Sequence, residues 1–207
     1  MKKFSGMPVS KKYNLPDWMK MFLEDKKGRE YKTDNDKMEL AIKLSELNVV
    51  NKTGGPFGSA VFDINTGKLV AAGVNIVLPE KSSFAHGEIM AIMMSQKKIN
   101  DFDLGINGRK TVLVSNADPC AMCYGALIWS GISEMICGAR GEDVERLTGF
   151  DEGPLHPDWV NEAGKRGISI KRDILREKAC EVLHLYMKEG GCIYNSSIVR
   201  TSIQRNI

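Results

Sequence analysis

The chain has 207 residues, 43% of them apolar, which is enough to bury one core and predicts a single α/β domain with extensions. No apolar stretch approaches the length of a membrane-spanning helix, and residues 1–6 are not followed by the apolar segment of a signal peptide. These features predict a cytoplasmic protein with no membrane partner.

The net charge of +3 is unevenly distributed along the chain. Residues 1–32 hold nine Lys or Arg and four Asp or Glu, which leaves 20 basic and 22 acidic side chains in the remainder. An enzyme that acts on nucleic acid usually needs a basic surface around its site to neutralise phosphates. The balance favours a small-molecule substrate and no nucleic-acid partner, although the basic front end leaves an RNA-binding role open.

Changes in composition along the sequence predict that the chain consists of three parts. Residues 1–33 mix prolines, a glycine and charged pairs around one short apolar stretch, residues 18–23, and we expect a basic N-terminal extension with one short helix. Residues 34–190 carry the periodic apolar patterns of a folded domain. Residues 191–207 form a C-terminal tail whose role the sequence does not indicate.

Within the domain, the apolar patterns alternate between helical and strand periods. Helices are expected over residues 34–50, 88–94, 123–129 and 173–188, and strands over residues 57–64, 68–77, 110–115, 134–138 and 167–171. The first two strands flank an Asn-Thr-Gly turn and predict a hairpin. Residues 138–164 are interrupted by glycines and prolines, so we expect an irregular loop there that decides substrate choice.

Two short segments hold the groups that carry chemistry: residues 86–88, His-Gly-Glu, and residues 119–123, Pro-Cys-Ala-Met-Cys. Catalytic zinc takes three protein ligands of nitrogen or sulfur type and keeps a fourth position open for water. His86, Cys120 and Cys123 supply that number and mixture, and both segments begin predicted helices, whose positive ends favour thiolates. The pattern predicts a Zn²⁺ cofactor and leaves Glu88 free as a general acid and base.

Each half of this pattern has a simpler interpretation when taken alone. A Cys-x-x-Cys pair can be a redox centre or half of a structural zinc site, and a His before a helix is usually an ordinary polar residue. The chain holds no second Cys-x-x-Cys, and a structural site is closed by a fourth ligand and needs no adjacent carboxylate. The combination favours a catalytic zinc site over a zinc-stabilised binding module.

The order His-x-Glu and then Pro-Cys-x-x-Cys resembles the signature of the cytidine-deaminase-like superfamily of zinc-dependent deaminases. The resemblance implies a three-layer α-β-α domain with a mixed five-stranded sheet, and a homodimer. It also implies hydrolytic deamination, in which Glu88 moves the protons and the zinc-activated water attacks the amino-bearing carbon.

Shorter stretches resemble the bacterial guanine deaminases and their purine-deaminase relatives. They are residues 54–58 (Gly-Gly-Pro-Phe-Gly), 73–75 (Gly-x-Asn), 125–129 (Gly-Ala-x-x-Trp) and 149–151 (Gly-Phe-Asp). This resemblance implies that Asn75 hydrogen-bonds the base, that Phe57 and Trp129 help to wall the pocket, and that Asp151 contacts a purine edge. Phe57 and Trp129 are also compatible with an ordinary role in the core.

Two departures leave the identity of the base open. Gly87 stands where guanine deaminases usually have Ala, as in fungal-type cytosine deaminases, and residues 115–118 differ from the usual residues before Pro-Cys. We therefore predict zinc-dependent hydrolytic deamination of a free purine-type nucleobase or small nucleoside, with guanine first. The alternatives are a cytosine- or cytidine-type deaminase and a tRNA adenosine deaminase.

Overall fold

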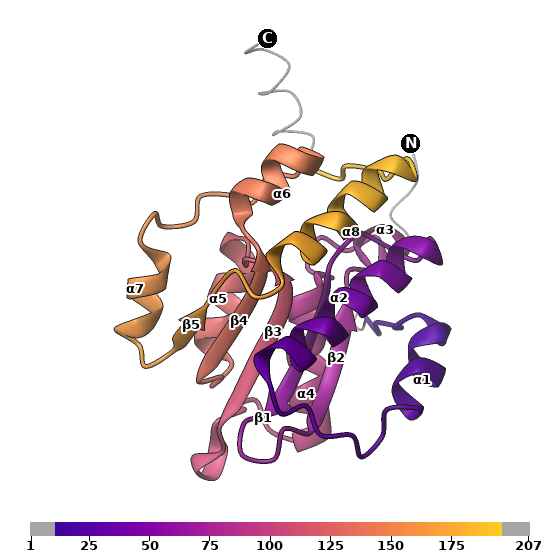
Figure 1. The fold of residues 1–207 in the computed structure, drawn as a ribbon. Helices are drawn as coiled ribbons and strands as arrows, with labels where there is room; N and C mark the ends of the chain where they lie inside the picture. Colours follow the sequence, from indigo (N-terminus) through magenta and orange to yellow (C-terminus); the bar gives the residue numbers. More distant parts are fainter. Residues whose placement is uncertain (1–10, 196–207) are drawn as a thin grey trace, which may run out of the picture.

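The computed structural model describes residues 11–195 and shows one mixed sheet (Figure 1). Its strands are β1 (Gly58–Asp63), β2 (Leu69–Val74), β3 (Thr111–Ala117), β4 (Glu134–Ala139) and β5 (Ser169–Lys171), in the spatial order β2-β1-β3-β4-β5. β1 runs antiparallel to β2 and β3, whereas β3, β4 and β5 are parallel. The expected mixed five-stranded sheet is confirmed.

Helices cover both faces of this sheet. They are α1 (Asp17–Glu24), α2 (Asp34–Val50), α3 (Val77–Glu80), α4 (Gly87–Ile99), α5 (Ala121–Trp129), α6 (Gly141–Thr148), α7 (Trp159–Gly164) and α8 (Arg176–Lys188). Figure 1 shows α2 and α8 in front of the sheet and α4 and α5 behind it, which confirms the three-layer α-β-α arrangement. None of the helices in residues 11–195 combines the length and the apolar character that crossing a membrane requires.

The central strand β3 shows how the sequence produces these layers. Successive side chains of a strand point to opposite faces. Val112 and Val114 pack in one apolar cluster with α2, whereas Leu113 packs in a second cluster with α4 and α5. Because both faces are covered, every residue of β3 is buried, and the strand appears in the sequence as an unbroken apolar and small-residue run.

α4 can lie close to the sheet because residue 73 of β2 has no side chain. A Cβ atom at Gly73 would come within 2.4 Å of the Ala91 nitrogen and 2.6 Å of the Gly87 carbonyl oxygen, both in α4. Only glycine permits this approach without displacing the helix backbone. The approach fixes where α4 begins, and its N-cap residue is His86.

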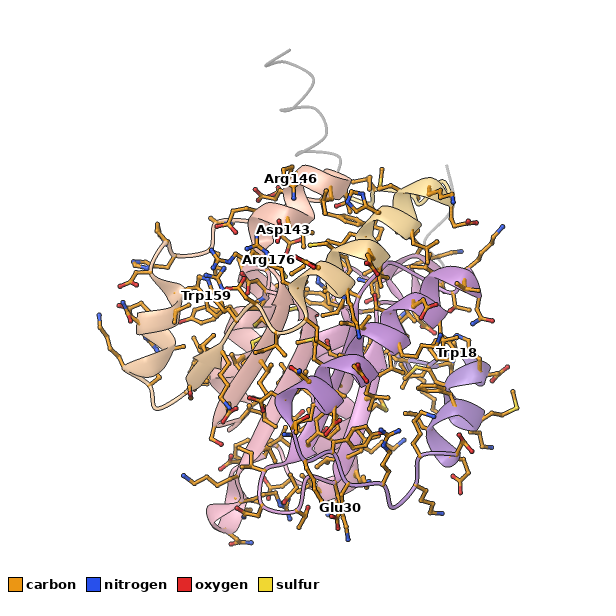
Figure 2. All side chains as sticks on the ribbon, in the orientation of Figure 1. Trp18, Glu30, Asp143, Arg146, Trp159 and Arg176 are labelled. Atoms are coloured by element: carbon orange, nitrogen blue, oxygen red, sulfur yellow. The ribbon has the colours of Figure 1, made fainter. Side chains whose placement is uncertain are left out.

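Residues 138–164 differ from the irregular loop that the sequence predicts, because they contain α6 and α7. The Asp143 carboxylate of α6 accepts hydrogen bonds from Arg176 of α8 at 2.7 and 3.0 Å and from Arg146 at 3.1 Å (Figure 2). The Arg176 hydrogen bond is the main cause that holds the pKa of Asp143 well below its usual range. This long-range ion pair attaches α6 to α8, and a local sequence pattern does not reveal it.

The N-terminal extension shares the core of the domain. Met19 of α1 and Tyr31 are buried in the same apolar cluster as α2. The Trp18 Nε1–H donates to Thr53 Oγ1 at 3.0 Å, and Glu30 forms an isolated antiparallel bridge with Lys68 (Figure 2). The expected boundary coincides with the start of α2, but the described part of the extension packs against the domain.

Replacing Met19, which is 2% exposed, by Ala should lower the free energy of unfolding by about 2–5 kcal/mol, because a buried methionine leaves a cavity. Met21 lies on the same helix and is 73% exposed, so Met21→Ala is the matched control and should change stability by less than about 0.5 kcal/mol. Urea denaturation of both variants measures the difference. Equal effects at the two positions would contradict the packing of α1 described above.

Candidate active site

The three candidate zinc ligands meet where α4 and α5 begin. His86 is the N-cap residue of α4, Cys120 is the N-cap residue of α5, and Cys123 lies in the first turn of α5. The His86 Nδ1 atom lies 3.6 Å from each sulfur, and the three ligand atoms lie within 4.8 Å of one another. Zinc bonds of about 2.3 Å to sulfur and about 2.0 Å to nitrogen, at a tetrahedral angle, separate such atoms by about 3.5 Å. The donor set and its spacing fit a zinc ion.

The start of α5 prepares the two thiols for a dication. The backbone N–H of Cys123 donates to Cys120 Sγ at 3.5 Å. A hydrogen bond from the Cys123 thiol is the largest cause that lowers the pKa of Cys120 to about 4, and His86 adds to the effect. The same contact raises the pKa of Cys123 well above its usual value. Cys120 is therefore a thiolate at neutral pH, which is the form that binds zinc.

Glu88 lies in the first turn of α4 and is buried. Burial raises the pKa of its carboxyl group to about 7, and the neighbouring Cys120 thiolate contributes to the rise. A carboxyl group whose pKa lies near neutrality can both take up and release a proton at physiological pH. The position therefore has the property that a general acid and base needs.

Gly87, one of the departures noted in the sequence, has a local steric reason. A Cβ atom at this position would lie 3.1 Å from the carbonyl oxygen of Phe57, which is closer than most side-chain contacts in proteins. Glycine lets the start of α4 lie directly against the residue that precedes β1. Phe57 in turn lines the pocket that opens beside His86.

The candidate ligands open into a pocket of about 160 Å³. It is lined by Phe57, His86, Glu88, Asp118, Cys120, Phe150, Asp151, Glu152, Tyr194 and Asn195. One side of the pocket is aromatic, since the Phe150 ring centroid lies 5.5 Å from that of Phe57 and 4.6 Å from that of Tyr194. Aromatic planes of this kind suit a flat heterocycle.

Asn75, predicted to contact the base, is buried next to the pocket lining. Its backbone N–H donates to the Phe57 carbonyl oxygen at 2.9 Å, and its Oδ1 atom accepts from the Val77 N–H at 3.3 Å. Within residues 11–195, the Asn75 Nδ2 atom has no hydrogen-bond partner. The Asn75 side chain faces the buried hydroxyl of Tyr194, a residue of the lining, whereas Asn75 itself does not line the pocket.

Trp129, by contrast, lies outside the pocket of its own chain. It is the last residue of α5 and is 84% exposed. The nine residues from Cys120 to Trp129 place it about 13 Å along the helix from the metal ligands. The structure therefore differs from the expectation that Trp129 walls the pocket, because its motif lies on a helix whose opposite end carries the site.

Glu152 is a pocket residue that the sequence analysis did not identify. Its carbonyl oxygen accepts the Ala121 N–H at 2.9 Å, which holds it beside the start of α5. Burial, followed by the charges of Cys120 and Glu88, raises the pKa of its carboxyl group to about 9, so it is neutral at pH 7.

The neighbouring Asp151 also lines the pocket, but its exposed carboxylate accepts the Gly153 N–H at 2.8 Å and stabilises the loop.

Asp118 fixes the loop that enters α5. It is buried, and its carboxylate accepts hydrogen bonds from Arg172, with Nε at 3.1 Å and a second bond from NH2, and from the Gly141 N–H at 3.2 Å. The Arg172 guanidinium lies 5.4 Å from the centroid of the Trp159 ring in α7 (Figure 2). These contacts connect the Cys120 loop to α6, α7 and the segment after β5.

The described part of the C-terminal tail closes the pocket. Asn195 Oδ1 accepts the Asp151 N–H at 3.1 Å, and Asn195 Nδ2 donates to the Gly149 carbonyl oxygen at 3.0 Å. Tyr194 packs against Phe150 on the aromatic side. No local motif indicates that these two residues reach the site. The rest of the predicted tail, residues 196–207, lies outside the described residues.

Residues 31–139 match the family described as the cytidine and deoxycytidylate deaminase zinc-binding region. This match covers more than half of the chain and includes the three candidate ligands and Glu88. The chain therefore belongs to the cytidine and deoxycytidylate deaminase family, and zinc is the cofactor for which its His-Cys-Cys site is built.

The chain is similar to deaminases that are named for different substrates. A probable cytosine deaminase of Schizosaccharomyces pombe is 32% identical over 155 residues, which cover 74% of this chain and 84% of that protein. The structure of the guanine deaminase from Nitrosomonas europaea is 35% identical with a TM-score of 0.80, covering 91% of this chain and 100% of that one. The structure of NE0047 in complex with 2,6-diaminopurine is 39% identical with a TM-score of 0.78, covering 85% and 93%. tRNA-specific adenosine deaminases are also relatives.

Substituting either Cys120 or Cys123 by Ala should abolish stoichiometric zinc binding, because three protein ligands leave no redundancy. The wild-type protein should hold one zinc per chain when measured by inductively coupled plasma mass spectrometry after dialysis. Cys192→Ala is the control, since Cys192 is exposed and free and should keep the metal. Full zinc content in either ligand variant would contradict the assignment.

The stability of the protein should depend on pH through Glu152. Its pKa is about 9 in the folded chain against an ordinary value of 4.5, so between these values the folded state binds one proton more than the unfolded state. The free energy of unfolding should therefore fall as pH rises from 5 towards 9, and this part of the slope should disappear in Glu152→Gln. Urea denaturation at pH 6 and pH 9 tests it, and parallel pH dependences would contradict the assigned shift.

Proposed function

We propose that the protein catalyses the zinc-dependent hydrolytic deamination of guanine as a free base and releases ammonia. The observation that carries the proposal is the pocket itself. Its volume is about 160 Å³, and two of the metal ligands, His86 and Cys120, surround that one small space together with the Glu88 and Glu152 carboxyl groups and an aromatic side. The similarity to the guanine deaminase of Nitrosomonas europaea supports the same substrate class.

Zinc held by His86, Cys120 and Cys123 supplies Lewis acidity and lowers the pKa of water to about 7. Glu88 takes a proton from the attacking water and delivers a proton to a ring nitrogen of the base. The same carboxylate then takes the proton of the hydroxyl group added to the amino-bearing carbon and gives it to the amino group, so that the C–N bond breaks and ammonia leaves as the carbonyl forms. Its pKa of about 7 in the pocket makes both protonation states accessible during the cycle.

Glu152 and Asn75 give the pocket polar groups that can pair with the edge of a base. A neutral carboxyl group can donate one hydrogen bond and accept another. Glu152 can therefore pair with the lactam edge of guanine, donating to O6 and accepting from N1–H. The Asn75 Nδ2 atom, beside the lining, supplies a further donor, and Phe57 and Phe150 form the aromatic side against which the flat ring packs.

The size of the pocket favours a base over a nucleoside. Pockets for drug-sized ligands are about 300–1,000 Å³, and this pocket is about half of the lower limit. Tyr194 and Asn195 are part of its lining, and Asn195 is tied to the loop at Gly149 and Asp151. This wall favours a free base over a base that carries a ribose.

Cytosine deamination is the second candidate, supported by the Schizosaccharomyces pombe relative and by Gly87. tRNA adenosine deamination has less physical support. The pocket is lined by the Asp151 carboxylate and by that of Asp118, which is paired with Arg172, and no Lys or Arg within residues 11–195 lines it. Carboxylates around a site repel the phosphates that a folded RNA would bring to it.

We also propose that the protein is a cytoplasmic homodimer of purine metabolism. Met93 of α4, Trp129 of α5 and Phe102, which follows α4, are large apolar side chains that this single chain leaves exposed. A second copy placed against the α4 and α5 layer would cover them. The cysteines of the chain are free, as is usual in a reducing compartment.

An ammonia-release assay with zinc-loaded protein tests the substrate. Guanine should react at least about tenfold faster than guanosine, adenine, adenosine, cytosine or cytidine, because about 1–3 kcal/mol separates a paired from an unpaired buried polar group. Glu88→Gln should retain zinc and lower kcat for guanine by about 10²- to 10⁴-fold, the usual scale of general acid–base catalysis.

Glu189→Gln, an exposed carboxylate beyond α8, is the control and should leave kcat unchanged. A preference for cytosine would favour the second candidate, and reaction with tRNA alone would contradict the small-molecule substrate. Unchanged turnover in zinc-loaded Glu88→Gln would show that another group moves the protons.

A further inference from the structure

A second cavity lies between the N-terminal extension and the free edge of the sheet. We call it the basic groove; its volume is about 560 Å³. It is lined by Leu15, Lys20, Leu23, Glu24, Lys26, Lys27, Gly28, Arg29, Lys68, Leu69, Val70, Ala71, Ala72, Met94 and Lys98. None of these residues lines the catalytic pocket. The groove contacts the last two turns of α4, whereas the metal ligands lie at the first turn.

Positive charge is concentrated in the basic groove. Six of its lining side chains are cationic and one, Glu24, is acidic. Glu24 is paired with Lys27 at 3.1 Å and Lys26 with Asp25 at 3.4 Å, which leaves four lining cations without an ion pair within residues 11–195. Lys20 and Lys68 have no ion pair and no side-chain hydrogen bond within residues 11–195, and both are exposed. Cations held together on low-dielectric walls create a local potential that attracts anions.

The floor of the basic groove is apolar and comes from the edge strand β2 and from α4, through Leu69, Val70, Ala71, Ala72 and Met94. Lys98 Nζ donates to the Val70 carbonyl oxygen at 2.7 Å and lies 3.4 Å from that of Leu69. This contact occupies backbone acceptors of β2, and the Glu30 bridge to Lys68 lies beside it, so little of this edge is open to an added peptide strand. The groove therefore suits a compact ligand better than an added strand.

The two terminal segments of this chain are positively charged, like the groove, and therefore do not complement its charge. Residues 1–10 contain two Lys and residues 196–207 contain two Arg, and neither segment contains an Asp or Glu. An occupant must bring its own negative charge. The volume of about 560 Å³ lies within the range of small-molecule sites, about 300–1,000 Å³.

We propose that the basic groove binds a nucleoside polyphosphate, with its base on the apolar floor and its phosphates between Lys20, Arg29 and Lys68. A polyphosphate supplies several charges in a short length, which matches cations gathered at one groove. A nucleic acid would instead need a basic track along the surface. The chain beyond residue 32 has 20 basic and 22 acidic side chains and offers no such excess.

Isothermal titration calorimetry of the zinc-loaded protein with ATP, tripolyphosphate and adenosine tests the site. ATP and tripolyphosphate should bind at one site per chain, and adenosine should not, because the phosphates provide most of the attraction. The double variant Lys20→Glu/Lys68→Glu should weaken ATP binding by at least about tenfold, since both positions lose a charge-assisted contact to a phosphate. Its deaminase activity should be unchanged.

Lys97→Glu/Lys110→Glu is the matched control: both residues are exposed, both lie outside the groove, and the net charge changes by the same amount. It should bind ATP as the wild type does. Equal weakening in both double variants, or ATP binding that guanine displaces, would overturn the proposal. So would tighter binding of a 12-nucleotide RNA that the groove variant alone abolishes, which would assign the groove to RNA. The readout is binding and is independent of the proposed reaction.

Discussion

The whole site depends on two helix N-termini that meet above one small volume. β2 and β3 run in the same direction because each is antiparallel to β1, so the chain leaves both strands at the same edge of the sheet. α4 follows β2 and α5 follows β3, and the two helices lie in the same layer. His86 therefore reaches Cys120 and Cys123 at 3.6 Å although more than 30 residues separate them. The positive ends of both helices then stabilise the anions gathered there.

That gathering of anions explains the proton chemistry of the pocket. Burial raises the pKa of Glu88 to about 7 and that of Glu152 to about 9, and the charge of the Cys120 thiolate contributes to both rises. Ionising every group within a pocket of about 160 Å³ would place like charges together in a poorly solvated space. The protons remaining on the carboxyl groups relieve this repulsion. The pocket thus holds one carboxyl group poised to exchange a proton and a second that stays neutral.

Local sequence signals predict the central part of this structure well. The zinc ligands lie at helix starts, so a few adjacent residues determine both the helix boundary and the ligand position. α2 begins at Asp34 because the Thr33 hydroxyl accepts the Asp36 N–H at 3.0 Å and the Asp36 carboxylate accepts the Thr33 N–H at 3.0 Å. Such pairs are visible within four residues of sequence.

The rest depends on contacts between distant segments and has no local pattern. An ion pair between Asp143 and Arg176, which are 33 residues apart, attaches α6 to α8. The local sequence around α6 contains glycines and no sign of this distant partner, so it predicted only a loop. The Gly-Phe-Asp motif indicated the right loop, but Glu152, one residue later, carries the shifted pKa. Trp129 matched a motif on the right helix, yet the direction of α5 places it at the far end.

The pocket residues fall into two sets along the chain, one inside the segment that matches the family and one after it. The family match ends at residue 139 and contains the zinc ligands, Glu88, Asn75 and Phe57. Phe150, Asp151, Glu152, Tyr194 and Asn195, which form the remaining wall, all lie beyond it. The chain is similar to proteins named as deaminases of cytosine, guanine and tRNA adenosine. We infer that the first set of positions provides the reaction and that the second set selects the base. Here the second set encloses a small aromatic space that carries the Asp151 carboxylate and no Lys or Arg, so it suits a flat base better than a polyanion.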